Sequence, residues 1–417
     1  MTATIRPQAS GLTFDVASVR ADFPILSELV HGKPLVYLDS ANTSQKPLSV
    51  ITATDSYYRH ANANIHRATH LLSERATALY EGARKKAAAF LNAPDARTIV
   101  LTKGTTDGIN LVANSYGRAM LKPGDEIILS WLEHHSNIVP WQLMAAQTGA
   151  TIRVIGINEA GELDLDQYAA LLSNRTRIVA VGHVSNALGT INPVKTMIDQ
   201  AHAVGAVVLV DGAQAAPHMA VDVQALDCDF YVLSSHKMFG PTGTGVLYGK
   251  AALLEAMPPY QGGGDMIASV TFEKTLYNEI PYKFEAGTPN MAGVVGLGAA
   301  IDYLATIDRA AALAHEDDVL AYATDRVREL GGIRIIGEAR HKTGVLSFVI
   351  DGVHPHDAGT ILDQQGIAVR TGQHCAQPVM DKFCIPATIR ASLAFYNTRA
   401  DIDALVTGLQ KVKAVFA

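Results

Sequence analysis

The feature that most limits how this chain can fold is a regular alternation of short apolar runs with helical patterns, which begins near residue 98. Strands that alternate with helices form βαβ units, and such units place the strands in a mostly parallel sheet with helices on both faces. The pattern therefore predicts an α/β fold with a large domain built on a mostly parallel, mixed sheet. The strand-like runs are Thr98–Leu101, Glu126–Ser130, Thr151–Ile155, Ile178–Val181, Val207–Val210, Phe230–Leu233 and Gly245–Leu247.

The segments beyond these runs predict a projection and a second, smaller domain. The rhythm breaks over residues 260–290, where the alternating stretch Ser269–Tyr282 favours a protruding hairpin or loop. Gly293–Ala314 has the pattern of one long helix, and the residues after it follow an order of helices and strands that is typical of an α+β layer. We expect an N-terminal arm that packs with the small domain (1–30), a large domain (31–298) and a small C-terminal domain (299–417).

Two of the predicted strands deliver groups of opposite charge to their ends. In a parallel α/β sheet the ligand lies at the carboxyl ends of the strands. Asp211 ends the Val207–Val210 run, and Lys237 follows the Phe230–Leu233 run. A carboxylate that keeps a pyridine nitrogen protonated and a lysine that forms a Schiff base with an aldehyde are the pair that pyridoxal phosphate requires. A lysine after a strand is also common on protein surfaces, so the assignment depends on what the other strand ends carry.

The other strand ends carry groups that suit the same cofactor. Thr105 and Thr106 open a helix whose N-terminus offers free N–H groups to a phosphate, although an ordinary threonine N-cap would give the same pattern. His134 is placed to stack on an aromatic ring, and Asn186 to bond a phenolate oxygen. Because the adjacent His135 points in a different direction, a chelate is disfavoured and we expect no metal. The same edge also carries Gln214, Ser234 and His236.

The second domain adds a thiol and a guanidinium. Cys375 lies beside His374 in a loop that follows the strand-like run Ile367–Val369. Cationic neighbours favour the thiolate, which is the nucleophilic form, while a loop cysteine without chemistry is the alternative. Arg390 is suited to a bidentate bond with a substrate carboxylate. An amino acid held in this way, with its amine on the pyridoxal, would face Cys375 with its side chain.

Composition excludes several classes of partner. The net charge is −6 and no long run of Lys or Arg is present, which argues against nucleic acid or an anionic membrane as a partner. No apolar stretch approaches the length of a membrane span, and Met1–Ser10 lacks the apolar core of a signal peptide. Three cysteines without a CxxC motif favour a reducing, cytoplasmic setting. Gly296-Leu297-Gly298 begins like a dinucleotide fingerprint, but it lies inside a helical run and predicts close helix packing instead.

Over nearly its whole length the chain resembles the group II, SufS-type cysteine desulfurases, which include selenocysteine lyases, in the class V aminotransferase superfamily. The resemblance implies a pyridoxal-phosphate-dependent transferase of fold type I. It also implies a homodimer that converts L-cysteine to L-alanine and passes sulfur toward iron–sulfur cluster assembly through an acceptor of the SufE or SufU type, with L-selenocysteine as a second substrate. The motifs that carry it are Tyr37-Leu38-Asp39, Gly104-Thr105-Thr106, Glu133-His134-His135-Ser136-Asn137-Ile138-Val139-Pro140-Trp141, His183-Val184-Ser185-Asn186, Asp211-Gly212-Ala213-Gln214, Ser234-Ser235-His236-Lys237, Phe284-Glu285-Ala286-Gly287-Thr288-Pro289 and Arg390-Ala391-Ser392-Leu393.

The resemblance also implies a role for each residue of the site. Lys237 is the Schiff-base lysine, Asp211 pairs with the pyridine nitrogen, and His134 is a catalytic residue that stacks on the ring. Cys375 is the catalytic nucleophile that takes the sulfur as a persulfide. Further contacts to the cofactor are expected from Thr105, Thr106, Asn186, Gln214, Ser234, His236 and, from a second subunit, Thr288. Contacts to the substrate are expected from Asn186, Arg370, Arg390 and, at the entrance, His66 and Arg67.

One position departs from the family pattern, and two rival functions follow from the same residues. The family reads Arg-x-Gly-His-His-Cys-Ala around its nucleophile, whereas Gln373 replaces the first histidine here, which removes a titratable group near the thiol. A kynureninase-like or epimerase-like class V enzyme is one rival, but such chemistry does not need Cys375. A non-catalytic scaffold on the same fold is the other, but the intact pair of Asp211 and Lys237 argues against it.

Overall fold

A seven-stranded mixed sheet forms the centre of the computed structural model, which describes residues 14–416. All seven predicted apolar runs are strands of this sheet, in the order β4-β10-β9-β8-β7-β5-β6, and only β10 runs antiparallel to its neighbours. The prediction of a mostly parallel, mixed sheet is therefore confirmed. The strands are β4 (Ile99–Thr102), β5 (Glu126–Ser130), β6 (Thr151–Ile155), β7 (Thr176–Gly182), β8 (Val207–Asp211), β9 (Phe230–Ser234) and β10 (Gly245–Gly249).

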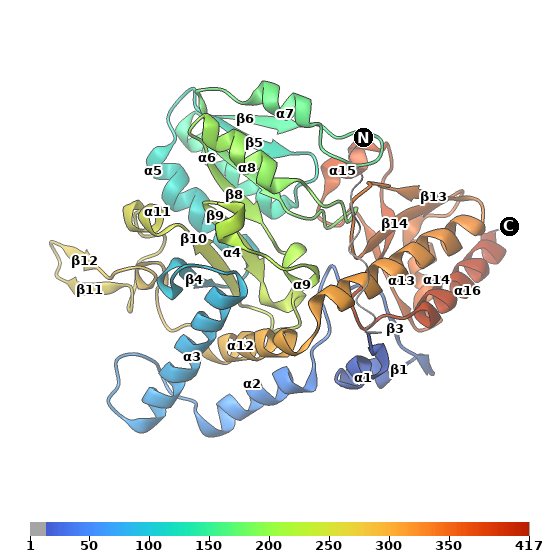
Figure 1. The fold of residues 1–417 in the computed structure, drawn as a ribbon, viewed down its shortest axis with the longest axis horizontal. Coiled ribbons are helices and arrows are strands. Elements are labelled where there is room, and N and C mark those ends of the chain that lie inside the picture. The colour runs from blue at the N-terminus through green and yellow to red at the C-terminus, as the bar shows by residue number, and fades with distance from the viewer. Residues whose placement is uncertain (1–13, 417) are drawn as a thin grey trace.

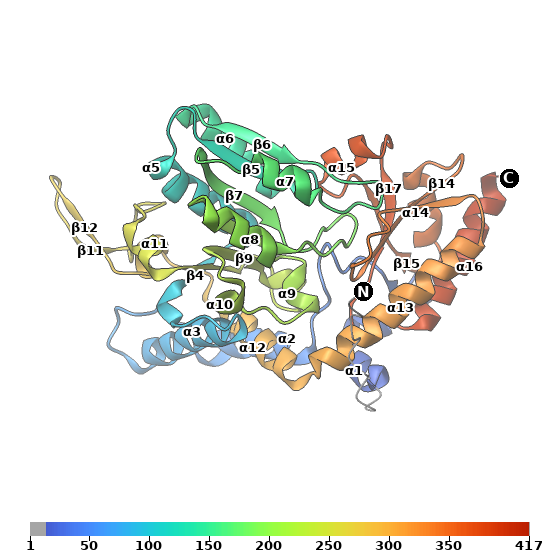
Figure 2. The ribbon, with the colours of Figure 1, turned by 45° about the horizontal axis from the view of Figure 1, so that its top comes forward.

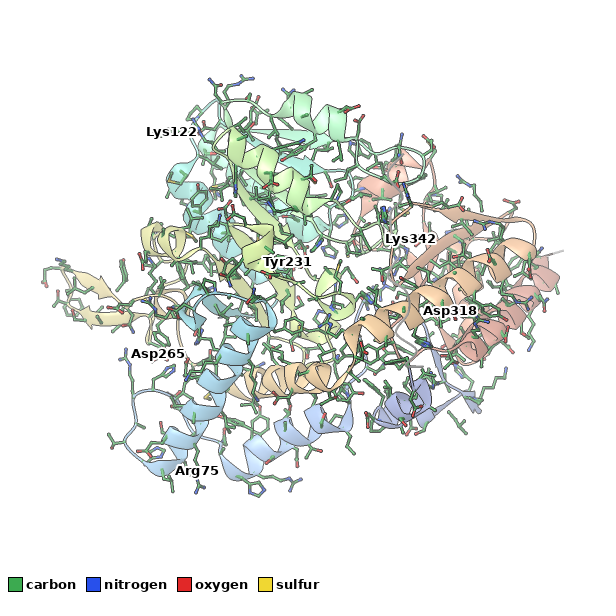
Figure 3. The ribbon with its side chains drawn as sticks, in the orientation of Figure 1. Arg75, Lys122, Tyr231, Asp265, Asp318 and Lys342 are labelled. Carbon is green, nitrogen blue, oxygen red and sulfur yellow. The ribbon has the colours of Figure 1, made fainter. Side chains whose placement is uncertain are left out.

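The sheet is buried on both faces, which explains why its central strands are continuously apolar. Successive side chains of a strand point to opposite faces. Val179 and Val181 of β7 accordingly belong to one core cluster, and Ile178 and Ala180 belong to another. The first cluster is completed by helices α3, α8 and α12 and the second by α4, α6 and α11. Tyr231, which lies at the middle of the large domain in Figure 3, is fully buried and belongs to the first of these two clusters.

Eleven helices surround or flank this sheet in the described part of the chain (Figure 1). They are α2 (Leu48–His60), α3 (Leu71–Phe90), α4 (Thr105–Val112), α5 (Arg118–Met120), α6 (Val139–Thr148), α7 (Leu165–Leu171), α8 (Val194–Ala203), α9 (Ala215–His218), α10 (Val223–Leu226), α11 (Ala251–Ala256) and α12 (Met291–Thr306). The close packing expected at Gly296 and Gly298 is confirmed, because a Cβ added at Gly298 would lie 2.9 Å from the Cβ of Ala83 in α3.

The prediction of one helix over Gly293–Ala314 is wrong. Helix α12 ends at Thr306, and after two intervening residues a separate helix, α13 (Arg309–Glu329), begins at an angle of 84° to it. Asp308 causes the new start, because its carboxylate caps the backbone N–H groups of Ala310 and Ala311 at 3.1 and 3.0 Å. Figure 2 shows that α13 carries the chain from the large sheet to the C-terminal layer.

The C-terminal layer is a four-stranded antiparallel sheet covered by helices. The strand order is β13-β14-β17-β16, and its core contains apolar residues of α13, α14 and α16. This is the predicted α+β arrangement. The strands are β13 (Ile333–Ile336), β14 (Val345–Ile350), β16 (Arg370–Gly372) and β17 (Thr388–Ser392), and the other helices are α14 (Pro355–Asp363), α15 (Gln377–Lys382) and α16 (Arg399–Phe416).

An early segment of the chain joins this C-terminal layer. Strand β3 (Val36–Tyr37) pairs in parallel with β15 (Ile367–Ala368), and Val36 and Leu38 lie in the C-terminal core. Before it come α1 (Val16–Ala21) and the small hairpin of β1 (Leu29–Val30) and β2 (Lys33–Pro34).

The N-terminal arm contacts both parts of the molecule. Arg20 bonds the carbonyl of Tyr396 and the carboxylate of Asp401, while Phe23 packs against Tyr303 and Phe239. Residues 1–13 of the predicted arm lie outside the described residues. The division at residues 30 and 298 stays a prediction.

A two-stranded hairpin projects from the large domain, at the opposite side from the C-terminal layer (Figure 1). It consists of β11 (Ile267–Val270) and β12 (Thr275–Tyr277), within the segment predicted to protrude. Its apolar side chains are open to solvent, and Phe272 at its tip is fully exposed. As for membrane spans, no single helix within residues 14–416 has the length and apolar character to cross a bilayer, and α12 with α13 meets the test only as a sharply bent pair.

Candidate active site

Lys237 and Asp211 meet at the carboxyl ends of neighbouring strands. Asp211 ends β8 opposite Val232 of β9, and Lys237 closes the short 3₁₀ turn Ser235–Lys237 that follows β9. Both line a cavity of about 170 Å³. Burial lowers the pKa of Lys237 to about 8 although the Asp211 carboxylate opposes the shift, and burial raises the pKa of Asp211. The pair predicted from the strand ends is thus brought together.

One end of the cavity is suited to a phosphate. Gly104 has φ +143°, and the turn it makes places Thr105 at the start of α4. Ser234 Oγ receives the N–H of Thr105 at 2.8 Å and donates to Thr105 Oγ1 at 2.8 Å, which locks β9 to the helix N-terminus. Thr106 and His236 line both this cavity and the adjoining one of about 410 Å³. Hydroxyls and free N–H groups at the positive end of α4 form a seat for an anion.

His134 is held as a neutral ring at the wall of the cavity. The N–H of Ser136 donates to His134 Nδ1 at 3.0 Å, so the ring proton lies on Nε2. Burial and the positive charge of Lys237 lower the pKa of His134 to about 3. Gln214 also lines the cavity, and its side-chain amide donates to the carbonyl of Ala41 at 2.6 Å.

Cys375 faces the same centre from the C-terminal layer. It lines a second cavity, of about 300 Å³, together with Lys237, His134 and Arg370. His374 and Cys375 both have φ +54°, a region that non-glycine residues adopt at a cost in free energy. Two bonds hold this loop in place: His135 N–H donates to the Cys375 carbonyl at 2.7 Å, and Asn186 Nδ2 donates to the His374 carbonyl at 2.6 Å.

Arg390 projects from β17 and lines the second cavity, and the protein uses only part of its set of donors. Its Nη1 donates to the carbonyl of Asn186 at 2.9 Å, and its Nη2 bonds Asp39 Oδ1 at 3.1 Å. Its buried Nε has no partner among the described residues. The charge of the guanidinium and its remaining N–H groups suit Arg390 to bind an anion in the cavity that it lines.

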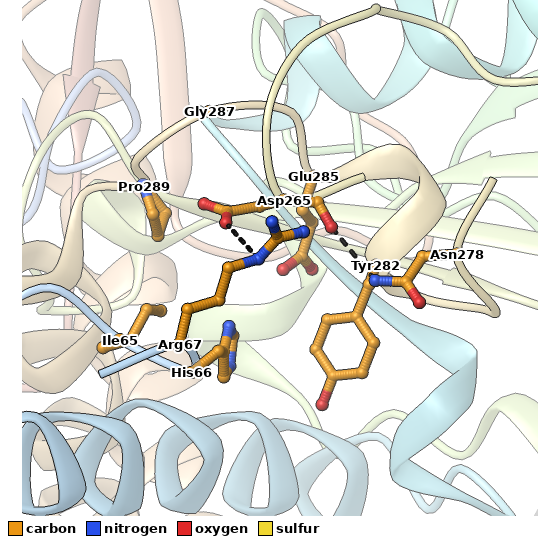
Figure 4. A pocket seen from close by; sticks show the side chains of 9 residues that line it. All are labelled: Ile65, His66, Arg67, Asp265, Asn278, Tyr282, Glu285, Gly287 and Pro289. Carbon is orange, nitrogen blue, oxygen red and sulfur yellow. Dashed lines mark hydrogen bonds and ion pairs between the residues drawn. The ribbon is translucent and has the colours of Figure 1, made fainter. Parts of the chain in front are cut away.

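Three residues predicted for the site lie elsewhere in a single chain. His66 and Arg67 line a separate cavity of about 250 Å³ (Figure 4), where His66 Nε2 bonds Glu81 and Arg67 pairs with Asp265 at 3.4 Å. Thr288 is exposed and lines neither cavity that contains Lys237. The structure thus does not bring these three to Lys237 within one chain.

Several residues of the site had no predicted role. Asn42 lines both cavities that contain Lys237, and Asp39 holds Arg390. Both lie in the polar turn after β3, whose placement depends on the long-range pairing of β3 with β15. Glu133 lines the first cavity, and burial raises its pKa to about 7. Its position one residue before His134 is the signal that could have found it.

The residues present fit pyridoxal phosphate. Asp211 Oδ1 accepts the N–H of Ala213 at 2.9 Å, and Oδ2 has no donor among the described residues, so it is available to a pyridinium N–H. Lys237 approaches from the neighbouring strand, and the anion seat at α4 lies at the same cavity. For metals, residues 14–416 contain no group of three or more His, Cys, Asp or Glu side chains that could hold an ion.

Comparison with known proteins agrees with this geometry. The chain matches the family described as aminotransferase class-V over residues 36–405. It is 52% identical over 412 residues to the cysteine desulfurase of Synechococcus elongatus, covering 99% of this chain and 66% of that protein. It is also 52% identical over 400 residues to the cysteine desulfurase of Dickeya dadantii, covering 96% and 97%.

A solved structure shows the same fold. The crystal structure of the cysteine desulfurase CsdA from Escherichia coli, as the S-sulfonic acid, superposes with a TM-score of 0.91 at 45% identity, covering 97% of this chain and all of that one. The predicted fold of a pyridoxal-phosphate-dependent transferase is thereby confirmed. The chain belongs to the class V aminotransferase family, its relatives are cysteine desulfurases, and its cofactor is pyridoxal phosphate.

Proposed function

We propose that this enzyme is a cysteine desulfurase that converts L-cysteine to L-alanine and keeps the sulfur as a persulfide on Cys375. One observation carries the proposal: a single cavity is lined by Lys237, Arg390 and Cys375. An amine site, a carboxylate site and a thiol around one space match the three functional groups of cysteine. The names of the relatives support the same activity.

The chain's own residues would bind the cofactor and the substrate from different layers. When bound, pyridoxal phosphate supplies an electron sink that weakens bonds at the carbon atoms of an amino acid attached to it. Asp211 would hold the pyridine nitrogen, the N-terminus of α4 the phosphate, and the neutral ring of His134 one face. Arg390, which lines the second cavity, would bind the substrate carboxylate through N–H groups of its guanidinium that have no protein partner, with Asp39 and Asn186 fixing that group.

Cys375 would perform the sulfur transfer. Its thiolate attacks the sulfur of the substrate, a sulfur–sulfur bond forms, and the carbon–sulfur bond breaks. The electron pair of the broken bond stays with the carbon, which takes up a proton and becomes the methyl group of alanine. No external oxidant or reductant is needed, because the cysteine carbon is reduced as the two sulfur atoms are oxidised to the persulfide level.

The exposed position of Cys375 supports delivery of the sulfur to another protein. We infer an acceptor of the SufE or SufU type and a role in supplying iron–sulfur cluster assembly. Gln373 also lines the cavity, so one fewer titratable group surrounds the thiol than in the family pattern, and a slow reaction without an acceptor is expected. L-Selenocysteine would be a second substrate, because a selenolate leaves more readily and depends less on Cys375.

The location and the assembly are also proposals. Three free cysteines suit a reducing cytoplasm. A homodimer is supported by the exposed apolar hairpin and by the distance of Thr288, His66 and Arg67 from the cavity in one chain.

The decisive experiment is the Cys375→Ala substitution, with Cys384→Ala as a matched control because Cys384 is also exposed and free but lines no cavity with Lys237. Cys375→Ala should bind the cofactor and keep its visible colour, while alanine formation from L-cysteine falls at least ~100-fold and no persulfide forms. Cys384→Ala should retain both. Alanine release by Cys375→Ala at the wild-type rate would make the thiol a bystander and the enzyme a plain lyase.

A further inference from the structure

The carbonyl oxygen of His236, next to Lys237 in the chain, is the meeting point of four hydrogen-bond donors. They come from a short segment, residues 43–46, that lies after β3. The backbone N–H of Ser44 donates at 3.0 Å, Thr43 Oγ1 at 3.0 Å, Ser44 Oγ at 3.2 Å and Lys46 Nζ at 2.9 Å.

This arrangement exceeds what the carbonyl needs. A carbonyl oxygen has two lone pairs, and one good donor is enough to satisfy it when buried. Ser44 Oγ also accepts the N–H of Phe239 at 2.7 Å. Residues 43–46 therefore form hydrogen bonds to the backbone both before and after Lys237. The consequence is a fixed peptide plane between His236 and Lys237, and this plane sets the direction in which the Lys237 side chain departs.

Lys46 differs from the other three donors because its side chain can carry a charge. Its Nζ also bonds the carbonyl of Ser44, so it bridges the segment and the turn. Within residues 14–416 no carboxylate lies within ion-pair distance of it. A shielded lysine without a counter-ion is costly to keep, and burial lowers its pKa to about 7. A lysine at this free-energy cost is expected where its amine has a function that a neutral side chain would not provide.

The segment is anchored on its far side to residues of the C-terminal layer and of β3. Tyr37 Oη donates to the Thr43 carbonyl at 2.7 Å, and the N–H of Gln45 donates to Tyr396 Oη at 3.2 Å. Residues 43–46, which bind the His236 carbonyl, are therefore held in place by residues outside the turn that contains Lys237.

We propose that Lys46 is a positioning residue for Lys237: its amine holds the His236 carbonyl and so directs the Lys237 side chain toward Asp211 and the cofactor. This inference rests on the proposed role of Lys237 as the lysine that binds the cofactor. It does not depend on which amino acid the enzyme uses or on Cys375.

The test compares Lys46→Met with Lys46→Arg, which keeps a cationic donor, and with Lys342→Met as a matched control. Lys342, labelled in Figure 3, is likewise a shielded lysine. Burial lowers its pKa to about 8, and its Nζ donates to the Gly337 carbonyl at 2.7 Å. It lies in the C-terminal layer and lines neither cavity with Lys237.

The first measurement is amide hydrogen exchange of the turn 235–240 in the cofactor-free protein, and the second is the affinity of that protein for pyridoxal phosphate. Lys46→Met should raise exchange in this turn and weaken cofactor affinity, each about tenfold, the size expected for losing one charge-capable hydrogen bond. Lys46→Arg should recover most of both, and Lys342→Met should change neither. In saturating cofactor, Lys46→Met should lower kcat and leave KM for L-cysteine unchanged, because Arg390 is untouched.

Unchanged exchange and unchanged cofactor affinity in Lys46→Met would overturn the proposal, as would an equal effect in Lys342→Met. If Lys46→Met does not fold, Lys46→Leu, which also lacks a hydrogen-bond donor, takes its place and is read in the same way. Exchange and cofactor affinity contain no desulfurase step, so a protein that fails to release alanine from cysteine would refute the proposed activity without affecting this test.

Discussion

At the scale of single residues, burial determines the protonation of the groups around Lys237. It lowers the pKa of His134 to about 3 and that of His236 to about 4, so both rings are neutral at physiological pH. It lowers the pKa of Lys237 to about 8, so about a tenth of this lysine is the nucleophilic free amine at pH 7, far more than for an ordinary lysine. The free amine is the state that condensation with an aldehyde needs.

The pH dependence of that condensation is a direct consequence. Below pH 8 the Lys237 ammonium has no lone pair to attack an aldehyde, and above it the free amine does, so bond formation should rise with pH through about 8. The measurement is the initial rate at which cofactor-free enzyme is trapped by borohydride at Lys237 with pyridoxal phosphate, as a function of pH. Asp211→Asn removes the charge that favours the ammonium, so its midpoint should shift to lower pH. A midpoint near that of a free lysine, or an upward shift in Asp211→Asn, would contradict this account.

At the scale of elements, the anion seat depends on a backbone-to-backbone contact between β10 and the turn before α4. A Cβ added at Gly245 would lie 2.5 Å from Gly104 Cα and 2.5 Å from the Leu233 carbonyl oxygen. Only glycine permits this approach, since rigid backbone lies on both sides. The one antiparallel strand of the large sheet thereby supports the turn that presents Thr105.

Gly245→Ala should consequently displace that turn. We expect a loss of roughly 2 kcal/mol of stability, typical of overpacking against rigid surroundings, together with weaker binding of pyridoxal phosphate. Gly82→Ala is the control: nothing lies within 4 Å of an added Cβ in α3, and alanine should stabilise the helix by up to about 1 kcal/mol. The measurements are thermal unfolding and cofactor titration of both variants. Wild-type stability and cofactor affinity in Gly245→Ala would show that the turn moves freely.

Elements with a strong local pattern could be predicted, and those defined by distant contacts could not. All seven runs of the large sheet were found because strands buried on both faces are apolar throughout. The break between α12 and α13 was missed because the small apolar residues on both sides of it continue one helical pattern, and only the Asp308 cap separates them. The pairing of β3 with β15 leaves no local signal, since two-residue strands acquire their partner from the tertiary fold.

At the scale of the whole molecule, the site is assembled from layers that are far apart in the chain. Sequence order along one sheet was enough to predict that Asp211, Gln214 and Lys237 share an edge, because parallel strands end together. The partners of Arg390 could not be predicted in this way, since they come from the turn after β3. His66, Arg67 and Thr288 remain apart from the cavity in one chain, so their predicted roles need a second subunit.

A two-fold dimer would supply these residues, and it predicts complementation between two variants that are each defective in cofactor binding. Lys237→Ala lacks the lysine of its own cavity, and Thr288→Val lacks a hydroxyl that we expect to serve the neighbouring cavity. In a mixed dimer one cavity would contain both defects, and the other would contain Lys237 from one subunit and Thr288 from its partner. The mixture should thus regain a population of sites with wild-type affinity for pyridoxal phosphate.

The experiment co-expresses the two variants with different affinity tags, isolates the mixed species and titrates it with the cofactor beside each parent dimer. Sedimentation should first show that the wild-type protein is a dimer, since a monomer with full cofactor occupancy would end the argument there. If Thr288 instead serves the cavity of its own chain, the Thr288→Val subunit keeps its weak site in every pairing. The mixed dimer would then bind no better than Thr288→Val alone, whereas recovery of tight binding requires that the hydroxyl cross the two-fold axis.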